Sequence, residues 1–217
     1  MLDVAQVDAE PTSQFRRWFA EAVAAGVPEP EAMCVASVDA SGWPAARMVL
    51  MKHVDRNGFV FYTNYHSDKG RQLAACSRAA LLWRWFLLER QVRVVGATER
   101  ATEAESDAYF ATRPRGSQLS AWASPQSRVL TDRAELERRM SEVVTRFGDG
   151  PLPRPPWWGG IRVVPESVEF WQGRPNRLHD RVRYRLADPP ERADRPDLAA
   201  PSGQSGPSGW IIERLAP

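Results

Sequence analysis

The fold of this 217-residue chain is decided around the stretch Glu169-Phe-Trp-Gln-Gly-Arg-Pro-Asn-Arg-Leu-His-Asp-Arg181. It begins with strand character and then breaks at a glycine and a proline, which end regular ladder pairing. Arg177, His179 and Arg181 share one parity, so an extended backbone would project all three from one face. Such cations repel one another unless an anion lies between them. An arginine run is commonly a solvated face, but the aromatic pair and the isolated histidine favour a functional site.

The composition is that of a globular protein without a strong charge bias. Hydrophobic residues make up 43% and charged residues 26%, and 29 basic against 27 acidic residues leave a net charge of +2. We therefore expect neither nucleic-acid nor membrane binding. Cys34 and Cys76 show no ligand spacing, and no run has the length or flanks of a signal or transmembrane segment. These features predict a cytoplasmic protein.

Alternating apolar residues separated by turn signals predict a mainly β chain with intercalated helices. The expected strands cover 32–38, 46–54 and 59–64 as an antiparallel meander, then 79–86, 91–98, 161–164, 167–172, 182–186 and 210–215. The expected helices run from Thr12 or Ser13 to Gly26, from Ser67 or Asp68 to Ala75, from the Thr102/Glu105 capping box to Pro114, and over 132–147.

These elements predict one α+β domain over residues 12–217, a β-barrel-like fold with helical cover. Residues 1–11 are expected to form an untethered, flexible arm. Residues 187–209, which are rich in proline, glycine and serine, are expected to form a flexible insertion between two strands.

Polar residues with a capacity for anions recur at separated places. Tyr109 and Arg113 share a helix face, and Ser117 follows at a new helix start or loop, which together would make an anion cradle. A helix-surface pair with an ordinary cap explains the same residues equally well. Arg47 and Lys52 end one apolar strand but differ in parity, so a regular strand would point them to opposite faces unless a bulge intervenes.

Basic side chains near residues 50, 69, 115 and 179, in a chain of small net charge, suit two localised phosphates better than a nucleic-acid groove. The three histidines lack metal-ligand spacing, so we expect no metal site. Nucleophile elbows and glycine-rich nucleotide loops are absent from the sequence. We therefore expect a bound cofactor to supply the chemistry.

Six motifs stand in the order seen in the pyridoxine/pyridoxamine 5′-phosphate oxidases, a family that this chain resembles from about Phe15 to Pro217, outside 187–209. The motifs are Arg47-Met-Val-Leu-Met-Lys52, Phe61-Tyr-Thr-Asn64, Glu89-Arg-Gln-Val92, Tyr109-Phe-x-x-Arg-Pro-Arg-x-Ser-Gln118, Trp158-Gly-Gly160, and Glu169-Phe-Trp-Gln-Gly173 with Arg177-Leu-His-Asp-Arg181. Each is weak alone, and together they are highly specific.

The resemblance implies an FMN-binding split β-barrel that forms a homodimer with the flavin at the subunit interface. It implies that Arg47 and Lys69 hold the FMN phosphate. The other cofactor residues implied are Met48, Val49, Leu50, Met51, Lys52, Tyr62, Thr63, Gln91, Gln126, Ser127, Trp171 and Arg181. It also implies that Lys52, Tyr109, Arg113 and Ser117 bind the substrate 5′-phosphate, while Arg177, Leu178 and His179 lie at the pyridine ring, with Arg177 and His179 catalytic.

The implied reaction is oxidation of pyridoxine 5′-phosphate, pyridoxamine 5′-phosphate or both to pyridoxal 5′-phosphate. The substrate C4′ carbon gives a hydride to flavin N5, and O2 reoxidises the flavin to give H2O2. A phenazine-type FMN oxidase ranks second, because Lys52 and the Arg-Pro-x-x-Ser-Gln pattern distinguish this chain from that group. The third interpretation is a flavin- or vitamer-binding split barrel without turnover.

Two departures from the family pattern qualify this interpretation. Acidic or neutral residues precede Phe15, where family members carry a basic, tyrosine-containing segment, and this favours the third interpretation. Asp68 stands where many relatives have an arginine beside the phosphate-binding lysine. One cation fewer is expected to weaken FMN retention by ~1 kcal/mol.

Overall fold

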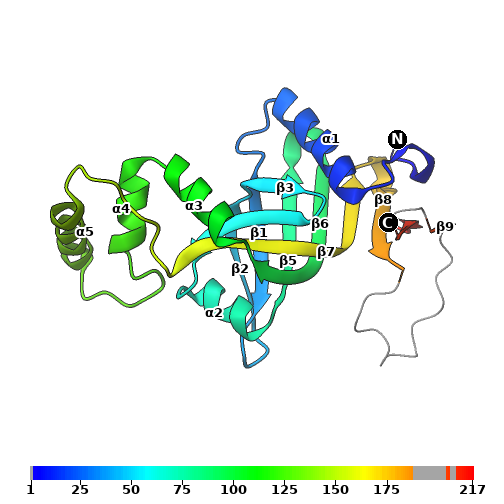
Figure 1. The fold of residues 1–217 in the computed structure, drawn as a ribbon. Coiled ribbons are helices and arrows are strands. Elements are labelled where there is room, and N and C mark those ends of the chain that lie inside the picture. The colour runs from blue at the N-terminus through cyan, green and yellow to red at the C-terminus, as the bar shows by residue number, and fades with distance from the viewer. Residues whose placement is uncertain (1, 188–203, 206–208) are drawn as a thin grey trace.

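The computed structural model describes residues 2–187, 204–205 and 209–217, and the predicted insertion therefore lies mostly outside the described residues. The described strands form one curled antiparallel sheet (Figure 1). Its order is β2 (Pro44–Leu50), β1 (Ala32–Val38), β5 (Arg78–Trp85), β6 (Arg90–Arg100), β7 (Trp158–Gln172), β8 (Asp180–Leu186), β10 (Trp210–Leu215) and β9 (Gln204–Ser205). The hairpin of β3 (His53–Asp55) and β4 (Gly58–Asn64) joins it through β7.

Strand β7 holds the barrel together by changing partners along its length. Its first half pairs with β4, its whole length beyond Ile161 pairs with β6, and its second half pairs with β8. The two strands expected at 161–164 and 167–172 are one continuous strand, with a register shift where Val95 opposes Ser167 and Gly96 opposes Pro165. A Cβ at Gly96 would lie 1.9 Å from the Val164 carbonyl oxygen, so only glycine fits at this bulge.

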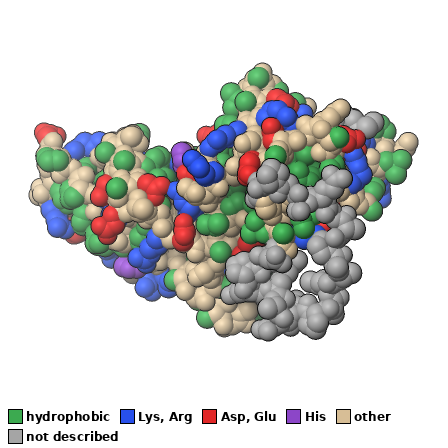
Figure 2. Space-filling model, turned by 45° about the vertical axis from the view of Figure 1, so that its right-hand side comes forward, with side chains coloured by type: hydrophobic (Ala, Val, Ile, Leu, Met, Phe, Trp, Pro, Cys, Tyr) green, Lys and Arg blue, Asp and Glu red, His purple; other side chains and the backbone are tan. Residues whose placement is uncertain are grey.

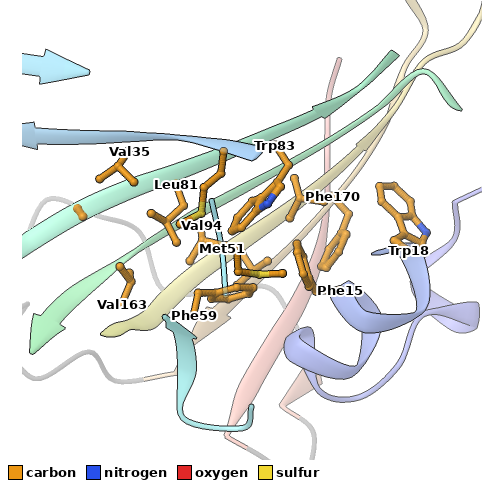
Figure 3. Close-up of a cluster of buried hydrophobic side chains, with 14 of the residues drawn as sticks. Phe15, Trp18, Val35, Met51, Phe59, Leu81, Trp83, Val94, Val163 and Phe170 are labelled. Atoms are coloured by element: carbon orange, nitrogen blue, oxygen red, sulfur yellow. The ribbon is translucent and has the colours of Figure 1, made fainter. Parts of the chain in front are cut away.

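The inner face of the curled sheet encloses an aromatic core (Figure 3). Helix α1 (Pro11–Ala24) places Phe15 within 4.8 Å of the Trp83 ring centre and 4.9 Å of Phe59, and all three side chains are fully buried. Each such side chain contributes ~1.5–3 kcal/mol by burial. The amphipathic spacing of α1 thus explains how the helix closes this end of the barrel.

The outer face of the sheet is different, because large apolar side chains on it are exposed. Met48, Leu50 and Leu82 are 66%, 37% and 36% exposed, whereas their strand neighbours of opposite parity face the core. Cross-strand register places Met48 beside Cys34 and Cys34 beside Leu82 in one row. A contiguous apolar row of this kind is typical of a surface that another protein covers.

Helices α3 (Glu103–Thr112), α4 (Arg115–Ala123) and α5 (Arg133–Phe147) gather at the opposite end of the sheet from α1 (Figure 1). The Thr102/Glu105 capping box is confirmed, and Ser67 caps α2 (Asp68–Ala75) as expected. On the face shown in Figure 2, acidic and basic side chains are interspersed. Among the described residues, no helix has the length and apolarity needed to cross a membrane.

Three local expectations are wrong. Residues 46–54 do not form one strand, because the chain leaves β2 after Leu50 and starts β3 at His53, and β4 pairs with β7 instead of completing a meander. Helix α1 begins at Pro11, with Glu10 as its N-cap, instead of at Thr12 or Ser13.

The segment before α1 is held, although an untethered arm was expected. It forms a 3-10 turn at Val4–Gln6, and Leu2 is buried. The Leu2 amide donates to Asp180 at 3.2 Å, and the Tyr184 hydroxyl donates to the Asp8 carbonyl at 2.7 Å. Strand β8 therefore binds this segment.

Candidate active site

Two cations lie together where β2 meets α2. The Arg47 guanidinium donates to Ser37 Oγ at 2.6 Å and to Gln72 Oε1 at 2.7 Å, so β1 and α2 fix its position on the inner side of the sheet. Burial lowers the pKa of Lys69, and the nearby positive charge of Arg47 lowers it further. Neither cation forms an ion pair within the part of the chain that the structure describes.

Neutral donors and acceptors complete this group. Gln126 Oε1 accepts from Lys69 Nζ at 3.0 Å and from Thr63 Oγ1 at 3.4 Å. Ser127, which follows, is exposed and has φ +68°. Two repelling cations that lack a carboxylate and stand among amide and hydroxyl groups fit a phosphate dianion well. We call Arg47, Thr63, Lys69, Gln126 and Ser127 the cofactor-phosphate group.

Asp68 stands beside these cations but turns to the helix surface. Its carboxylate pairs with Arg71, one turn along α2, and both side chains are about half exposed. Its negative charge raises the pKa of both Arg47 and Lys69, although burial outweighs this effect. The expected weakening of cofactor retention stays a prediction.

A second anion-seeking group lies between α3 and α4. Tyr109 stacks on Tyr62 with ring centres 3.9 Å apart, and the Arg113 guanidinium lies 4.6 Å from the centre of the Trp158 ring. Burial lowers the pKa of Arg113, and its buried Nη1 has no hydrogen-bond partner among the described residues. Ser117 lies in the first turn of α4, and its backbone N–H donates to the Pro114 carbonyl at 2.8 Å.

A cavity of about 310 Å³ adjoins this second group, lined by Asn64, Arg113, Gln126, Met140 and Trp158 among others. Lys52 is exposed at the break between β2 and β3, which resolves the parity difference from Arg47 that the sequence left open. We call Lys52, Tyr109, Arg113 and Ser117 the substrate-phosphate group. The structure brings Tyr109 and Arg113 together, and it shows no contact of the Lys52 or Ser117 side chain with them.

The third group is a row across the outer face of the sheet. Gln91 of β6 is the register partner of Trp171 of β7, and Trp171 is the register partner of Arg181 of β8. Arg181 Nε donates to the buried Glu169 at 2.8 Å. Burial alone would raise the pKa of Glu169, but the hydrogen bond from Arg181 and the charges of Arg93 and Arg181 hold it below its usual range. Glu169 therefore stays ionised, and its hydrogen bond from Arg181 fixes the position of the Arg181 side chain.

The turn that follows β7 shows that the extended backbone expected for Arg177, His179 and Arg181 is wrong. Asn176 and Arg177 have left-handed φ values of +57° and +61°, so the backbone from Arg177 to Arg181 is not extended. Of the three predicted cations, Arg181 pairs with the carboxylate of Glu169, and the neighbouring Arg174 pairs with Asp180 at 2.8 Å. Arg177 and Leu178 are exposed, and the His179 ring lies 4.5 Å from Trp171.

The sheet divides the predicted cofactor residues of one chain between its two faces. Arg47 contacts inner-face residues of β1, and Met51 belongs to the core, whereas Gln91, Trp171 and Arg181 lie on the outer face. Met48 and Leu50 also lie on that face, and Val49 is partly buried against the core. The sheet therefore separates the two groups of one chain, and Arg47 lies on its edge strand β2.

Several residues that shape these groups were missed from the sequence. Ser37, Gln72 and Glu169 hold the arginines, and Trp158 organises the ring stack. Glu169 carried a signal, because it shares parity with Trp171 in the quoted stretch. Ser37 and Gln72 carried none, because their contacts with Arg47 bridge 10 and 25 residues of sequence. Among the described residues, no cluster of three or more His, Cys, Asp or Glu could hold a metal.

Comparison with known proteins gives matches along almost the whole chain. Residues 19–147 match the family model described as pyridoxamine 5′-phosphate oxidase, and residues 158–217 match one described as a pyridoxine 5′-phosphate oxidase C-terminal dimerisation region. Pyridoxine/pyridoxamine 5′-phosphate oxidases of Ralstonia pickettii and Cupriavidus necator are 56% and 58% identical over 100% of this chain and 93% of theirs.

Solved structures are also similar. PhzG from Burkholderia lata 383, solved in complex with tetrahydrophenazine-1-carboxylic acid, is 28% identical with a TM-score of 0.85, over 100% of this chain and 97% of that one. An FMN-binding protein of Nostoc punctiforme, related to pyridoxamine 5′-phosphate oxidase, is 16% identical with a TM-score of 0.67, over 94% and 97%, and so shares the fold.

Proposed function

The chain belongs to the pyridoxine/pyridoxamine 5′-phosphate oxidase family of FMN-dependent oxidoreductases, and we propose that it oxidises pyridoxine 5′-phosphate, pyridoxamine 5′-phosphate or both to pyridoxal 5′-phosphate. The observation that carries this proposal is the unpartnered, buried Arg113 Nη1 beside Tyr109 and the start of α4. It supplies a second anion site besides the cofactor-phosphate group, as a phosphorylated substrate requires.

Each group of residues would have a separate role. Arg47 and Lys69 would hold the FMN phosphate, and the substrate-phosphate group would anchor the substrate ester. Gln91, Trp171 and Arg181 would position the flavin ring, while Arg177 and His179 would orient the pyridine ring and steady charge that develops on it. FMN, when bound, would accept a hydride from the substrate C4′ carbon and pass two electrons to O2 to give H2O2, and with the amine substrate water would then release ammonia from the oxidised product.

We further propose a homodimer in which each FMN lies at the interface. The apolar outer row of Met48 and Leu82 supports this, as does the match to a dimerisation region. Because the cofactor residues of one chain lie on opposite faces, each flavin would take its phosphate contacts from one protomer and its Gln91, Trp171 and Arg181 contacts from the partner.

An anaerobic flavin-bleaching assay tests the proposed reaction. The FMN-loaded protein is expected to lose its visible absorbance when mixed with pyridoxine 5′-phosphate or pyridoxamine 5′-phosphate, and to recover it with H2O2 release when air is admitted. Unphosphorylated pyridoxine is the control and should bleach poorly, because it cannot use the Arg113 site. Bleaching by a dihydrophenazine carboxylate but by neither vitamer would favour the phenazine-type alternative, and FMN binding without bleaching would favour a non-catalytic protein.

The lowered pKa of Lys69 predicts how FMN affinity depends on pH. The free protein binds FMN with a constant affinity while Lys69 stays protonated, and the dissociation constant should rise once the pH passes its lowered pKa, below the ordinary 10.5. Bound phosphate stabilises the charged lysine, so the pKa of Lys69 is higher in the complex than in the free protein. The dissociation constant therefore stops rising once the pH exceeds the pKa of the complex. Fluorescence titrations with FMN between pH 7 and 10 measure this. Lys69→Arg should flatten the profile, and an unchanged slope in that variant would assign the titration elsewhere.

A further inference from the structure

Trp158 is the centre of the ring cluster beside the substrate-phosphate group. It is 6% exposed, and its ring lies 5.4 Å from Tyr62 and 6.2 Å from Tyr109, nearly parallel to both at 13° and 7°. Phe110 meets it edge-on at 5.2 Å. Trp158 therefore packs against two consecutive residues near the end of α3.

The guanidinium of Arg113 lies over the indole instead of beside a carboxylate. Its Cζ atom is 4.6 Å from the centre of the Trp158 ring, and among the described residues it forms no ion pair. A partly desolvated cation is attracted electrostatically to the face of an indole ring. An aromatic face holds a guanidinium without occupying its N–H donors, whereas a bidentate carboxylate would occupy them and neutralise the charge. The indole thus leaves Arg113 free for an incoming anion.

The backbone around Trp158 is itself fixed. Its amide donates to the Pro155 carbonyl at 3.0 Å, and its carbonyl accepts from Arg154 Nη1 at 2.7 Å. The next residue but one, Gly160, lies under Tyr62, and a Cβ there would be 3.1 Å from the Tyr62 ring and 2.6 Å from Ala101. The Trp-Gly-Gly motif thereby lets the Tyr62 ring lie against β7, parallel to the indole.

We propose that Trp158 is a positioning residue for the substrate phosphate, holding Arg113 by its indole face and Tyr109 through the parallel ring stack. This inference rests on the proposed function, because it assigns a task within the substrate-phosphate group. Trp158 would act on phosphate affinity through Arg113 and Tyr109. Because it also stacks on Tyr62, an expected FMN residue, we expect a smaller effect on FMN affinity.

Steady-state kinetics of FMN-loaded Trp158→Leu test this role. The KM for the better vitamer is expected to rise about 10-fold or more, because the guanidinium loses the face that orients it. At saturating FMN the turnover number should stay within about 2-fold of the wild-type value, and the FMN dissociation constant should change less than the KM does. Equilibrium dialysis with pyridoxal 5′-phosphate should show a matching loss of affinity. Trp158→Phe, which keeps an aromatic face, should recover most of the affinity.

Trp122→Leu is the matched control. Trp122 packs against Phe147 and Trp157 and carries Arg146 over its ring at 5.2 Å, so its loss removes a similar cluster away from Arg113. If Trp158 were merely structural, both leucine variants would show the same lowered melting temperature and the same lowered active fraction, and their KM would be unchanged. That result would overturn the proposal. Should Trp158→Leu fail to fold, Trp158→Phe decides: its smaller ring predicts a KM rise of about 3-fold, and an unchanged KM overturns the proposal.

The wild-type protein separates this inference from the proposed function. If it oxidises a vitamer while Trp158→Leu keeps the wild-type KM and dissociation constant, only the role of Trp158 fails. If the wild-type protein neither oxidises a vitamer nor binds pyridoxal 5′-phosphate, the proposed function fails, and the role of Trp158 fails with it.

Discussion

Replacing Arg177 with alanine is expected to lower the turnover number by about 100-fold while leaving the FMN dissociation constant within about 2-fold of wild type. Arg177 is exposed at the turn after β7, and it makes no ion pair with the described residues. Its removal should therefore cost little stability, and what is lost should be its action on the substrate ring. Stopped-flow reduction with the better vitamer and fluorescence titration with FMN measure the two quantities separately.

Arg47→Ala is expected to have the opposite effects, weakening FMN binding and leaving turnover nearly unchanged. The Arg47 guanidinium is fixed by Ser37 and Gln72 in the cofactor-phosphate group, so its loss is expected to raise the FMN dissociation constant by about 30–100-fold. Turnover at saturating FMN should change little. If Arg177→Ala and Arg47→Ala each reduced turnover and FMN affinity alike, the assignment of these two arginines would be wrong. Arg177→Lys, which keeps the charge without the planar fork, separates charge from geometry.

Combining two variants that are inactive at limiting FMN is expected to restore activity. In homodimers of Arg47→Ala or of Arg181→Ala, both flavin sites would be damaged. Under the proposed arrangement Arg47 and Arg181 of one chain, on opposite faces of the sheet, would serve different flavins, so a mixed dimer would have one site with both defects and one site with neither. Random pairing makes half of the dimers mixed, each with one intact site, so activity at limiting FMN should reach about a quarter of wild type.

Co-expression with two different affinity tags and purification through both would isolate the mixed dimers. Arg47→Ala paired with Lys69→Ala is the control, since both residues lie in the same cofactor-phosphate group and no intact site can form. Restoration by the control pair as well, or by neither pair, would contradict a flavin site shared between protomers. Melting temperatures of both homodimers should accompany the assay, because Arg181 also pairs with the buried Glu169.

Local signals in the sequence predicted most of the elements. The capping box of Thr102 and Glu105 sets the start of α3, and the alternation of residues 32–38 gives β1 with its observed bounds. Non-local pairing could not be predicted: the sequence places Phe61 in a hairpin-linked strand, but only the fold shows that β4 joins Ile161 of β7, one hundred residues away. Pairing over such distances leaves no local pattern.

In the candidate site, too, local patterns predicted individual residues but not the contacts that depend on the fold. The family motifs selected Arg47, Trp171 and Arg181, but which face each occupies depends on strand register. The left-handed backbone at Asn176 and Arg177 was also hidden, because neither residue is glycine. Ser37 and Gln72, which fix Arg47, likewise become its partners only when β1 and α2 are folded against β2.

The position of β7 in the chain constrains the order in which this protein can fold during synthesis. Strands β4 and β6 both leave the ribosome before β7, and each waits for it as a pairing partner along one edge. Until about residue 172 has emerged, the growing chain presents two unpaired edges and an open aromatic core. Native structure should therefore appear late and abruptly during translation, and we expect this window to be where a chaperone gives the nascent chain the most protection.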